Sequence, residues 1–526
     1  MIARRLLLAA PALLGAAAVR AQVTTLDLPP ATPATRPDDW TAAGHRRDIL
    51  IRWGDRVTFD APPWDPRNPT EDGASGQFGW DGRLAGLVAP PLGGDGVPRL
   101  VVAIAHPGVD PGLAFPGNRD RPAIAAAMAG ASLLNLERHD GRWVLVDGGF
   151  QSRRLGTATL CRIGGPAAAA LGSGVVGLLG PIAGTATPWG TLLLAEQDPA
   201  SWLARLDGLD ARFRDARPFG WLAEIDPLDP QSVPVKRSAI GRIGAQAVAA
   251  TVAEDGRAVV FLADGRPMGF LYRFVSARPA READSLDAGQ LAVAKVEGEA
   301  IAWLPLPASA LLAPHPAAEQ AGASPFDTPA ALATDPRRMR LLLGCRAGTT
   351  RGAAQVDALN PRPGPHPGQV IEITGDPTAP RMAARILFLA GDVAEGGQYG
   401  RDMPANSAVP RHPATLAIDA RGRLWMGTDR AGRPGAVPDM AFACDLDGPG
   451  RAVPLPIHAA PRGGAIGGAA PTPEGDSLLL VVRTPGAEPG ATFDRPATRW
   501  PGFDNRLPPR TALVSITRNA GGQIGG

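Results

Sequence analysis

Side chains that catalyse reactions or hold metals often stand at characteristic spacings, and few such spacings occur in this sequence. The seven histidines never lie at metal-ligand spacing with one another, so we expect loop or surface positions for them. The cysteines form no Cys-x-x-Cys pair, which argues against a thiolate zinc site. Ser173 lies in Gly-Ser-Gly rather than in a nucleophile elbow, and 180–184 lacks the Lys-Ser/Thr ending of a phosphate loop. None of these common motifs therefore indicates a reaction.

The elements that position any site follow one recurring local pattern. A loop with Asp, Gly or Pro is followed at once by a short β-forming run, as in a tight hairpin. Copies of this pattern begin at Asp140, Glu254, Asp335, Asp419 and Pro473. Further apolar runs of strand length begin at Leu100, Phe270, Gln369, Arg385 and Thr511. Many short strands indicate an all-β protein, and one hairpin recurring over the whole chain favours a β-propeller over a sandwich.

The spacing of the copies is irregular, so loop insertions must interrupt the period. Short helices are expected at 123–129 and 199–212, and no linker divides the chain after residue 46. We therefore predict one propeller domain over 46–518. An extended Pro- and Thr-rich lead-in at 22–45 precedes it, and a flexible tail at 519–526 follows it.

The N-terminal segment is typical of export. Residues 1–21 combine two adjacent arginines, an apolar run and a small residue at Ala21, as in a secretory signal peptide. The Arg4-Arg5 pair followed by three leucines resembles a twin-arginine signal, with an ordinary secretory signal as the alternative. No later segment is apolar for eighteen residues, so we expect a periplasmic or secreted protein without a membrane span.

Charge and cysteine content narrow the classes of partner. The net charge is +2, which argues against general nucleic-acid binding because that function needs a basic surface. The odd number of cysteines leaves at least one thiol unpaired within the chain. We expect buried free thiols, although one disulfide among Cys161, Cys345 and Cys444 is an open alternative. The sequence does not define the oligomeric state.

Three long segments resemble a known family. They are RWGDRVTFDAPPWDPRNPTEDGASGQFGWDGRLAG from Arg52, TPWGTLLLAEQ from Thr187 and FGWLAEIDPLDPQSVPVKRSAIGRIGAQA from Phe219. Their order and wording resemble the PhoX family of secreted bacterial alkaline phosphatases. The resemblance implies a six-bladed propeller that hydrolyses phosphomonoesters with a cluster of iron and calcium ions in its channel. Such a cluster neutralises phosphoryl charge and stabilises the leaving oxygen.

The chain departs from this family at positions that the resemblance assigns to metal ligands. Hard cations need charged oxygen ligands, but these positions carry aliphatic side chains or a neutral amide. They are Ile182, where the family has a cysteine, and Gln246, Ala330, Ala331, Ala414 and Ala465. The lost charge predicts that iron is not bound, and that calcium is either absent or held at a reduced site.

Acidic residues do remain near the loops to which the resemblance assigns the metals. Glu196, Asp264, Asp392 and Asp429 are the candidate catalytic or calcium-binding residues, with turn capping as the alternative role. Lys236 and Arg242 are candidate anion-binding residues, with a solvated strand face as the alternative. A phosphate-containing or other anionic small molecule is the expected partner.

Three functions are compatible with these residues. The first is a degenerate PhoX-like protein that is non-catalytic or weakly active and binds a ligand or partner in its channel. The second is an active phosphatase or phosphodiesterase with a reduced calcium-dependent site. The third is a periplasmic interaction propeller without a small-molecule site. Whether acidic side chains converge in the channel separates these functions.

Overall fold

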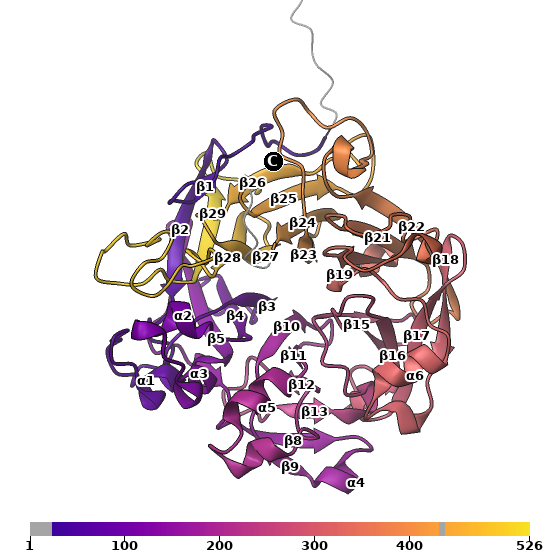
Figure 1. The fold of residues 1–526 in the computed structure, drawn as a ribbon, viewed down its shortest axis with the longest axis horizontal. Coiled ribbons are helices and arrows are strands. Elements are labelled where there is room, and N and C mark those ends of the chain that lie inside the picture. Colours follow the sequence, from indigo (N-terminus) through magenta and orange to yellow (C-terminus); the bar gives the residue numbers. More distant parts are fainter. Residues whose placement is uncertain (1–23, 431–436) are drawn as a thin grey trace, which may run out of the picture.

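The computed structural model describes residues 24–430 and 437–526. The expected signal peptide at 1–21 lies outside the described residues. Within them, mostly antiparallel blades are arranged radially around a central axis (Figure 1). Each blade contributes one innermost strand, and each innermost strand packs against the next in a closed ring. In chain order these are β3 (Arg83–Val88), β10 (Pro181–Ala186), β14 (Ala247–Val252), β19 (Pro329–Asp335), β23 (Pro413–Ile418) and β27 (Ala465–Pro471). The described chain is therefore a six-bladed β-propeller, as predicted.

The first three blades follow one another along the chain. Blade 1 adds β4 (Arg99–His106), β5 (Gly130–His139), β6 (Arg142–Leu145) and β7 (Arg153–Leu155) to β3. Blade 2 adds β11 (Leu192–Glu196), β12 (Leu222–Ile225), β13 (Val235–Arg237), β8 (Leu160–Gly164) and β9 (Gly174–Val176) to β10. Blade 3 adds β15 (Arg257–Ala263), β16 (Leu271–Pro279), β17 (Gly289–Val296) and β18 (Ala300–Pro305) to β14.

Blades 5 and 6 include the strand pairings that close the ring. Blade 4 adds β20 (Arg340–Cys345), β21 (Gln369–Thr374) and β22 (Arg381–Leu389) to β19, and β22 pairs with β18 of blade 3. Blade 5 adds β24 (Arg423–Thr428), β25 (Met440–Asp445), β26 (Leu455–Ala459) and the N-terminal β1 (Trp40–Thr41) to β23. Blade 6 adds β28 (Ser477–Arg483), β29 (Ala512–Arg518) and the N-terminal β2 (His45–Arg52) to β27. The two ends of the chain are thus joined by strand pairing.

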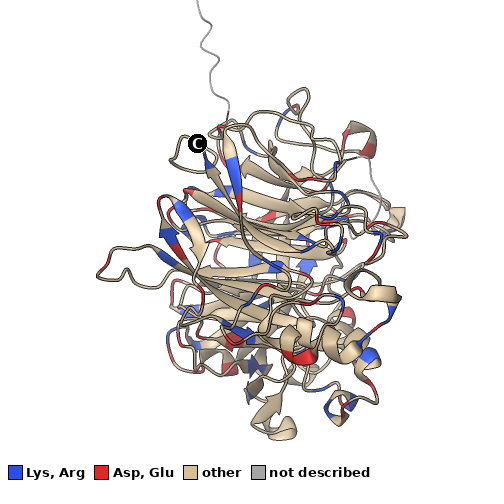
Figure 2. Cartoon of the chain, turned by 90° about the vertical axis from the view of Figure 1, so that its left-hand side faces the viewer, with Lys and Arg blue, Asp and Glu red and all other residues tan. Residues whose placement is uncertain are grey.

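The helices are short and lie in insertions between strands. They are α1 (Glu71–Gly76), α2 (Pro111–Ala114), α3 (Pro122–Met128), α4 (Ala168–Leu171), α5 (Ala200–Leu206) and α6 (Pro314–Gln320). The helices expected at 123–129 and 199–212 correspond to α3 and α5. Among the described residues, no helix is long and apolar enough to cross a membrane. On the side seen in Figure 2, residues of both charges are interspersed.

The hydrophobic core lies between neighbouring blades. One cluster of buried side chains joins blades 3 and 4 through Phe261 and Ile371, for example. Another joins blades 5 and 6 and includes Leu26, Leu28 and Ile524. Ile524 is fully buried and its N–H donates to Gly475 O at 2.8 Å, so the tail expected to be flexible is packed against the last blades. Burial of these apolar side chains is the physical reason.

The propeller axis opens into a cavity of about 460 Å³ at one end. All six innermost strands line it, from the second residue of β3 and of β14 to the turns that follow β10, β19, β23 and β27. Its walls are mostly Ala, Thr, Leu and Pro side chains together with backbone. Among the described residues, Cys161, Cys345 and Cys444 are buried and free, as expected. Burial raises the pKa of Cys161 to about 11 and that of Cys444 to about 12, so both thiols stay protonated.

Candidate functional site

The innermost strands begin at the end of the channel that lies opposite this cavity. We call it the strand-start end. The positions where the resemblance implies lost metal ligands lie at or beside these starts. They are Ile182 in β10, Gln246 directly before β14, Ala330 and Ala331 in β19, Ala414 in β23, and Ala465 in β27. All except Gln246 are buried. The structure therefore brings these positions to one end of the channel, where aliphatic side chains stand.

Three of the four candidate acids also lie at the strand-start end. Glu196 is the last residue of β11, and Asp264 and Asp429 directly follow β15 and β24. Each therefore ends the second strand of its blade, which runs antiparallel to the innermost strand. Asp392 is different because it follows β22, the outermost strand of blade 4. Three of the candidate acids therefore lie at the strand-start end, and Asp392 lies farther from the propeller axis.

Glu196 is committed to a buried ion pair with Lys236. Both side chains are fully buried, and Lys236 Nζ lies 2.8 Å from Glu196 Oε1. The Glu196 carboxylate also accepts hydrogen bonds from the backbone N–H groups of Leu179, Gly220 and Trp221, at 2.8 to 3.1 Å. These contacts satisfy both oxygens. Lys236 is thus not available to an anion in the channel, because its charge is already neutralised inside blade 2.

Arg242, Asp264 and Asp392 also hold backbone rather than a ligand. Arg242 donates to the carbonyls of Phe219 and Ala216 at 2.7 and 2.9 Å, so its charge fixes a loop. Asp264 accepts from the N–H of Phe270 at 3.1 Å, and its other oxygen lies 2.8 Å from His315 Nδ1. Asp392 caps a short 3-10 helix by accepting from Glu395 N at 3.0 Å. The Asp264 and Asp392 contacts match the capping role given above as the alternative, whereas Arg242 lies in a loop and not on a solvated strand face.

Asp429 belongs to an ion-pair network that crosses the strand-start end. Arg483, the last residue of β28, bonds Asp429 of blade 5 and both oxygens of Asp81, at 2.9 and 2.5 Å for Asp81. Arg83, the first residue of β3, reaches Asp429 Oδ2 at 3.2 Å. These side chains are 1–15% exposed. We call Asp81, Arg83, Asp429 and Arg483 the channel network, and it ties blades 1, 5 and 6 together.

Burial and neighbouring charge set the protonation of this network. Burial, and then the charge of Arg483, lowers the pKa of Arg83 to about 10. Burial by itself lowers the pKa of Arg483, but the carboxylates of Asp81 and Asp429 hold that pKa above its usual value. Asp439 lies close by at the start of β25, where burial, and then Asp429, raises its pKa to about 6. The arginines therefore stay charged at neutral pH, as a cross-blade tie requires.

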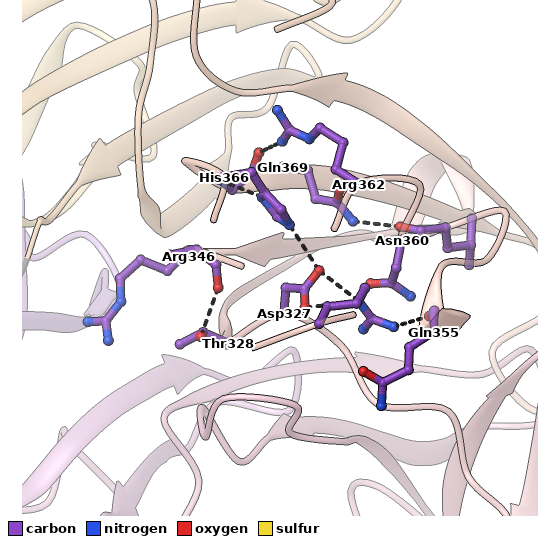
Figure 3. A network of polar contacts seen from close by, with 12 residues as sticks. Asp327, Thr328, Arg346, Gln355, Asn360, Arg362, His366 and Gln369 are labelled. Atoms are coloured by element: carbon purple, nitrogen blue, oxygen red, sulfur yellow. Dashed lines mark hydrogen bonds and ion pairs between the residues drawn. The ribbon is translucent and has the colours of Figure 1, made fainter. Parts of the chain in front are cut away.

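A second polar network supports the loop that follows β20. Arg351 Nε lies 3.0 Å from both oxygens of Asp327, and His366 Nε2 lies 3.1 Å from one of them. His366 Nδ1 accepts from Gly368 N at 3.2 Å, so neither ring nitrogen is left for catalysis. Figure 3 shows this network with Arg346 beside it, and the Arg346 guanidinium points away from Asp327. The network fixes the loop from which Arg346 projects.

Comparison with known proteins defines the family. The family described as alkaline phosphatase PhoX matches residues 28–486, which is most of the chain. The chain belongs to the PhoX family. A solved structure of Pseudomonas fluorescens PhoX in complex with vanadate, a transition state analogue, superposes with a TM-score of 0.83 at 24% identity, covering 96% of this chain and 100% of that chain. This PhoX-family propeller thus has the predicted fold.

Other likenesses are weaker. A gluconolactonase from Xanthomonas campestris aligns at a TM-score of 0.30 and 12% identity, covering 93% of this chain and 98% of that chain. An α-L-arabinofuranosidase from Fusarium graminearum aligns at 0.35 and 9%, covering 90% and 98%. Both scores are too low to inform the site. No curated protein matches the chain in sequence.

The donor set at the strand-start end does not fit a multi-metal centre of the PhoX kind. Over 24–430 and 437–526, no three His, Cys, Asp or Glu side chains form a group that could hold a metal ion. Methyl and methylene groups of the alanines and Ile182 offer no lone pairs, and the nearby carboxylates are bonded to arginine, lysine, histidine or backbone. The residues at this end therefore support no chemical step through a metal.

Sequence reasoning missed the basic half of the site. Arg83 stands at the start of an innermost strand, and Arg346 and Arg483 stand at the end of a second strand, as three of the candidate acids do. Arg346 directly follows a second strand, as Asp264 and Asp429 do, so counting to that position in each blade would have found it. The cationic candidates from the sequence were Lys236 and Arg242, and neither belongs to this group of arginines.

The expectation that every histidine lies in a loop or on the surface was wrong. His106 and His458 are fully buried within β4 and β26, and His366 is 7% exposed. His106 lies 2.8 Å from Ser132 Oγ and also bonds the carbonyl of Asp81, while His458 Nδ1 lies 3.1 Å from Thr41 Oγ1. Local hydrogen bonds allow a neutral imidazole to be buried at acceptable cost.

Proposed function

We propose that this protein is a degenerate PhoX-family member that does not hydrolyse phosphomonoesters through a metal centre. It acts instead by binding a small anionic ligand at the channel. The observation that carries the proposal is the channel network. Arginine and aspartate side chains tie blades 1, 5 and 6 at the strand-start end, beside the aliphatic positions Ala414 and Ala465.

Electrostatics supports this proposal. A metal cluster of high positive charge needs an excess of anionic ligands around it. At the strand-start end the carboxylates of Asp81 and Asp429 already share two buried guanidinium groups, and Glu196 neutralises Lys236. Adding cations there would require these ion pairs to break, and removing one partner of a buried pair typically costs about 3–5 kcal/mol.

The cofactor and the location form part of the same proposal. We propose that the protein holds no iron, and that any calcium is bound singly and weakly. We also propose that it is exported to the periplasm or secreted, because the Arg4-Arg5 pair and the apolar run after it resemble a twin-arginine signal.

An assay of p-nitrophenyl phosphate hydrolysis tests the loss of activity. The mature protein is assayed in EDTA, with calcium alone, and with calcium and iron, beside Pseudomonas fluorescens PhoX as the positive control. We expect no release above a no-enzyme blank in any condition. Loss of one metal ligand costs about tenfold to a hundredfold, and several positions differ together here. Calcium-dependent turnover that Asp264→Asn abolishes would instead support the reduced-site phosphatase.

A further inference from the structure

Arg346 carries an unused charge at the strand-start end. Among the described residues, its guanidinium makes no hydrogen bond or ion pair, whereas its backbone is firmly held. The N–H of Arg346 donates to Thr328 O at 2.9 Å, and His412 Nδ1 lies 3.2 Å from its carbonyl. The residue is half-buried and directly follows Cys345, the last residue of β20. Figure 3 shows its side chain extended away from the Asp327 network.

Arg83 provides a second positive charge from the opposite side of the ring. It comes from blade 1, and Arg346 comes from blade 4. Arg83 is 8% exposed, and its Nε is buried without a hydrogen-bond partner among the described residues. The charge of Arg346 contributes to lowering the pKa of Arg83, so the two guanidinium groups lie within electrostatic range. Arg83 has Asp429 as one partner at 3.2 Å, and the Arg346 guanidinium has no partner among the described residues.

Gln246 adds a neutral donor to the same end. It lies directly before β14 of blade 3, next to blade 4, and its side chain packs on Gly265. Its amide makes no hydrogen bond with a described residue. Two guanidinium groups and one amide therefore offer donors toward one end of the channel. Guanidinium forks bind carboxylate, sulfate and phosphate oxygens in pairs, and such charge-assisted bonds are the strong ones.

We propose that the strand-start end is an oxyanion site in which Arg346 binds the ligand and Arg83 supplies the second charge. The ligand is a small oxyanion, either free or the terminal group of an organic ester, and it is bound without being turned over. The bound anion supplies the counter-charge that Arg346 lacks and relieves its repulsion with Arg83. The inference rests on the proposed function because it requires a channel end without a metal centre.

Isothermal titration of the EDTA-treated mature protein at low salt tests this site. The probes are inorganic phosphate, sulfate and phenyl phosphate, with chloride as the negative control. We expect saturable binding of at least one probe. Tighter binding of phenyl phosphate identifies an ester as the ligand, and equal binding of phosphate and sulfate identifies a free oxyanion. No binding of any probe to the wild-type protein overturns the inference.

Variants of Arg346 make the test specific. Arg346→Met should weaken binding about tenfold or more, since it removes charge-assisted hydrogen bonds. Arg346→Lys keeps the charge but not the fork, so it should show a smaller loss, and it replaces the methionine variant if that variant does not fold. The matched control is Arg281→Met, because Arg281 is exposed in the turn after β16. Unchanged binding in both Arg346 variants contradicts the inference.

The outcome separates this inference from the proposed function. Binding that appears only after calcium is restored would overturn the metal-free oxyanion site, and only calcium-dependent hydrolysis would overturn the proposed function as well. Absence of anion binding together with absence of p-nitrophenyl phosphate hydrolysis would overturn the oxyanion site and the anionic ligand of the proposed function, but not the loss of phosphatase activity.

Discussion

Guanidinium groups hold the strand-start end together at the level of single residues. Arg483 and Arg83 share Asp429 between them, and Arg483 also bonds Asp81. The carboxylates of Asp429 and Asp81 are at most 5% exposed. Water therefore cannot take over their role as counter-charges without a cost in stability. In a buried network of this kind, loss of one partner is more damaging than the net value of the pairs, because a charge is left uncompensated.

Asp429→Asn tests the channel network. The change leaves Arg83 and one end of Arg483 without their counter-charge, so we expect the free energy of unfolding to fall by about 3–5 kcal/mol. Urea denaturation followed by tryptophan fluorescence measures it. The control is Asp402→Asn, an exposed aspartate without an ion pair among the described residues, and its effect should stay within about 0.5 kcal/mol. Equal effects of the two changes would refute the structural role of Asp429.

Two buried groups, His458 and Asp439, change the free energy of unfolding in opposite directions as the pH falls. Burial, and then Arg47, lowers the pKa of His458 from 6.5 to about 3. The unfolded chain therefore binds a proton that the folded chain does not, and His458 destabilises the fold as the pH falls from 6.5 toward 3. Asp439, with its pKa raised from 3.8 to about 6, binds a proton first in the folded state. Its contribution therefore rises as the pH falls from 6 toward 3.8.

Variants at these two positions should change the pH profile in opposite directions. Relative to the wild type, His458→Gln should gain stability on acidification and Asp439→Asn should lose it. Each change amounts to about 1.4 kcal/mol per pH unit at most within its window. Urea unfolding at pH 7, 6, 5 and 4.5 gives the slopes. Parallel profiles for the two variants would show that neither group titrates as its burial requires.

At the scale of elements, the recurring hairpin marks a fixed place in the blade. Four of its five copies form the turn between the innermost and second strands of blades 3 to 6, namely those at Glu254, Asp335, Asp419 and Pro473. The fifth, Asp140-Gly141, joins β5 and β6, with both residues at positive φ as a two-residue hairpin favours. The second strands therefore all return to the strand-start end, and their last residues meet there.

β27 packs closely against blade 1, and a substitution at Gly467 tests this contact. A Cβ on Gly467 would lie 2.1 Å from the carbonyl oxygen of Gly82, so Gly467→Ala must push the two blades apart. We expect a loss of about 1–3 kcal/mol in unfolding free energy, the usual cost of overpacking. Gly94→Ala is the matched control, since nothing lies within 4 Å of a Cβ there. Equal stability of the two variants would contradict the tight closure of the ring.

The sequence predicted individual strands but not the contacts between distant blades. Turn residues and β-forming runs are local signals, so strands such as β4, β21 and β29 were expected from apolar runs beginning at Leu100, Gln369 and Thr511. The channel network was not foreseeable in this way. Asp81 and Arg483 are 402 positions apart, and they meet only because the last blade closes against the first. Their pairing depends on register and ring closure, for which no local pattern exists.

At the scale of the whole molecule, strand pairing joins both ends of the chain. β2 pairs with β29 in blade 6, and β1 pairs with β26 in blade 5. Such closure demands that the N-terminal segment and the last strand be present together before the ring is complete. The proposed twin-arginine route exports chains that are already folded.

Replacing Arg4 and Arg5 with lysine tests that route. We expect the precursor to stay in the cytoplasm, because the twin-arginine pair would be lost while the positive charge is kept. Cell fractionation with immunoblotting measures the processed and unprocessed forms. An ordinary secretory signal needs only positive charge, so normal processing of the lysine variant would show that the alternative signal is used.

Metal content shows whether the channel holds a multi-metal centre. Protein purified from its exporting host, without chelators, is measured by elemental analysis against protein concentration, with Pseudomonas fluorescens PhoX treated in the same way. The channel network and the aliphatic strand starts predict less than about 0.1 iron per chain and at most one weakly held calcium, since too few free carboxylates remain. Two irons per chain, retained through dialysis, would contradict the proposal that the channel has lost its metal centre.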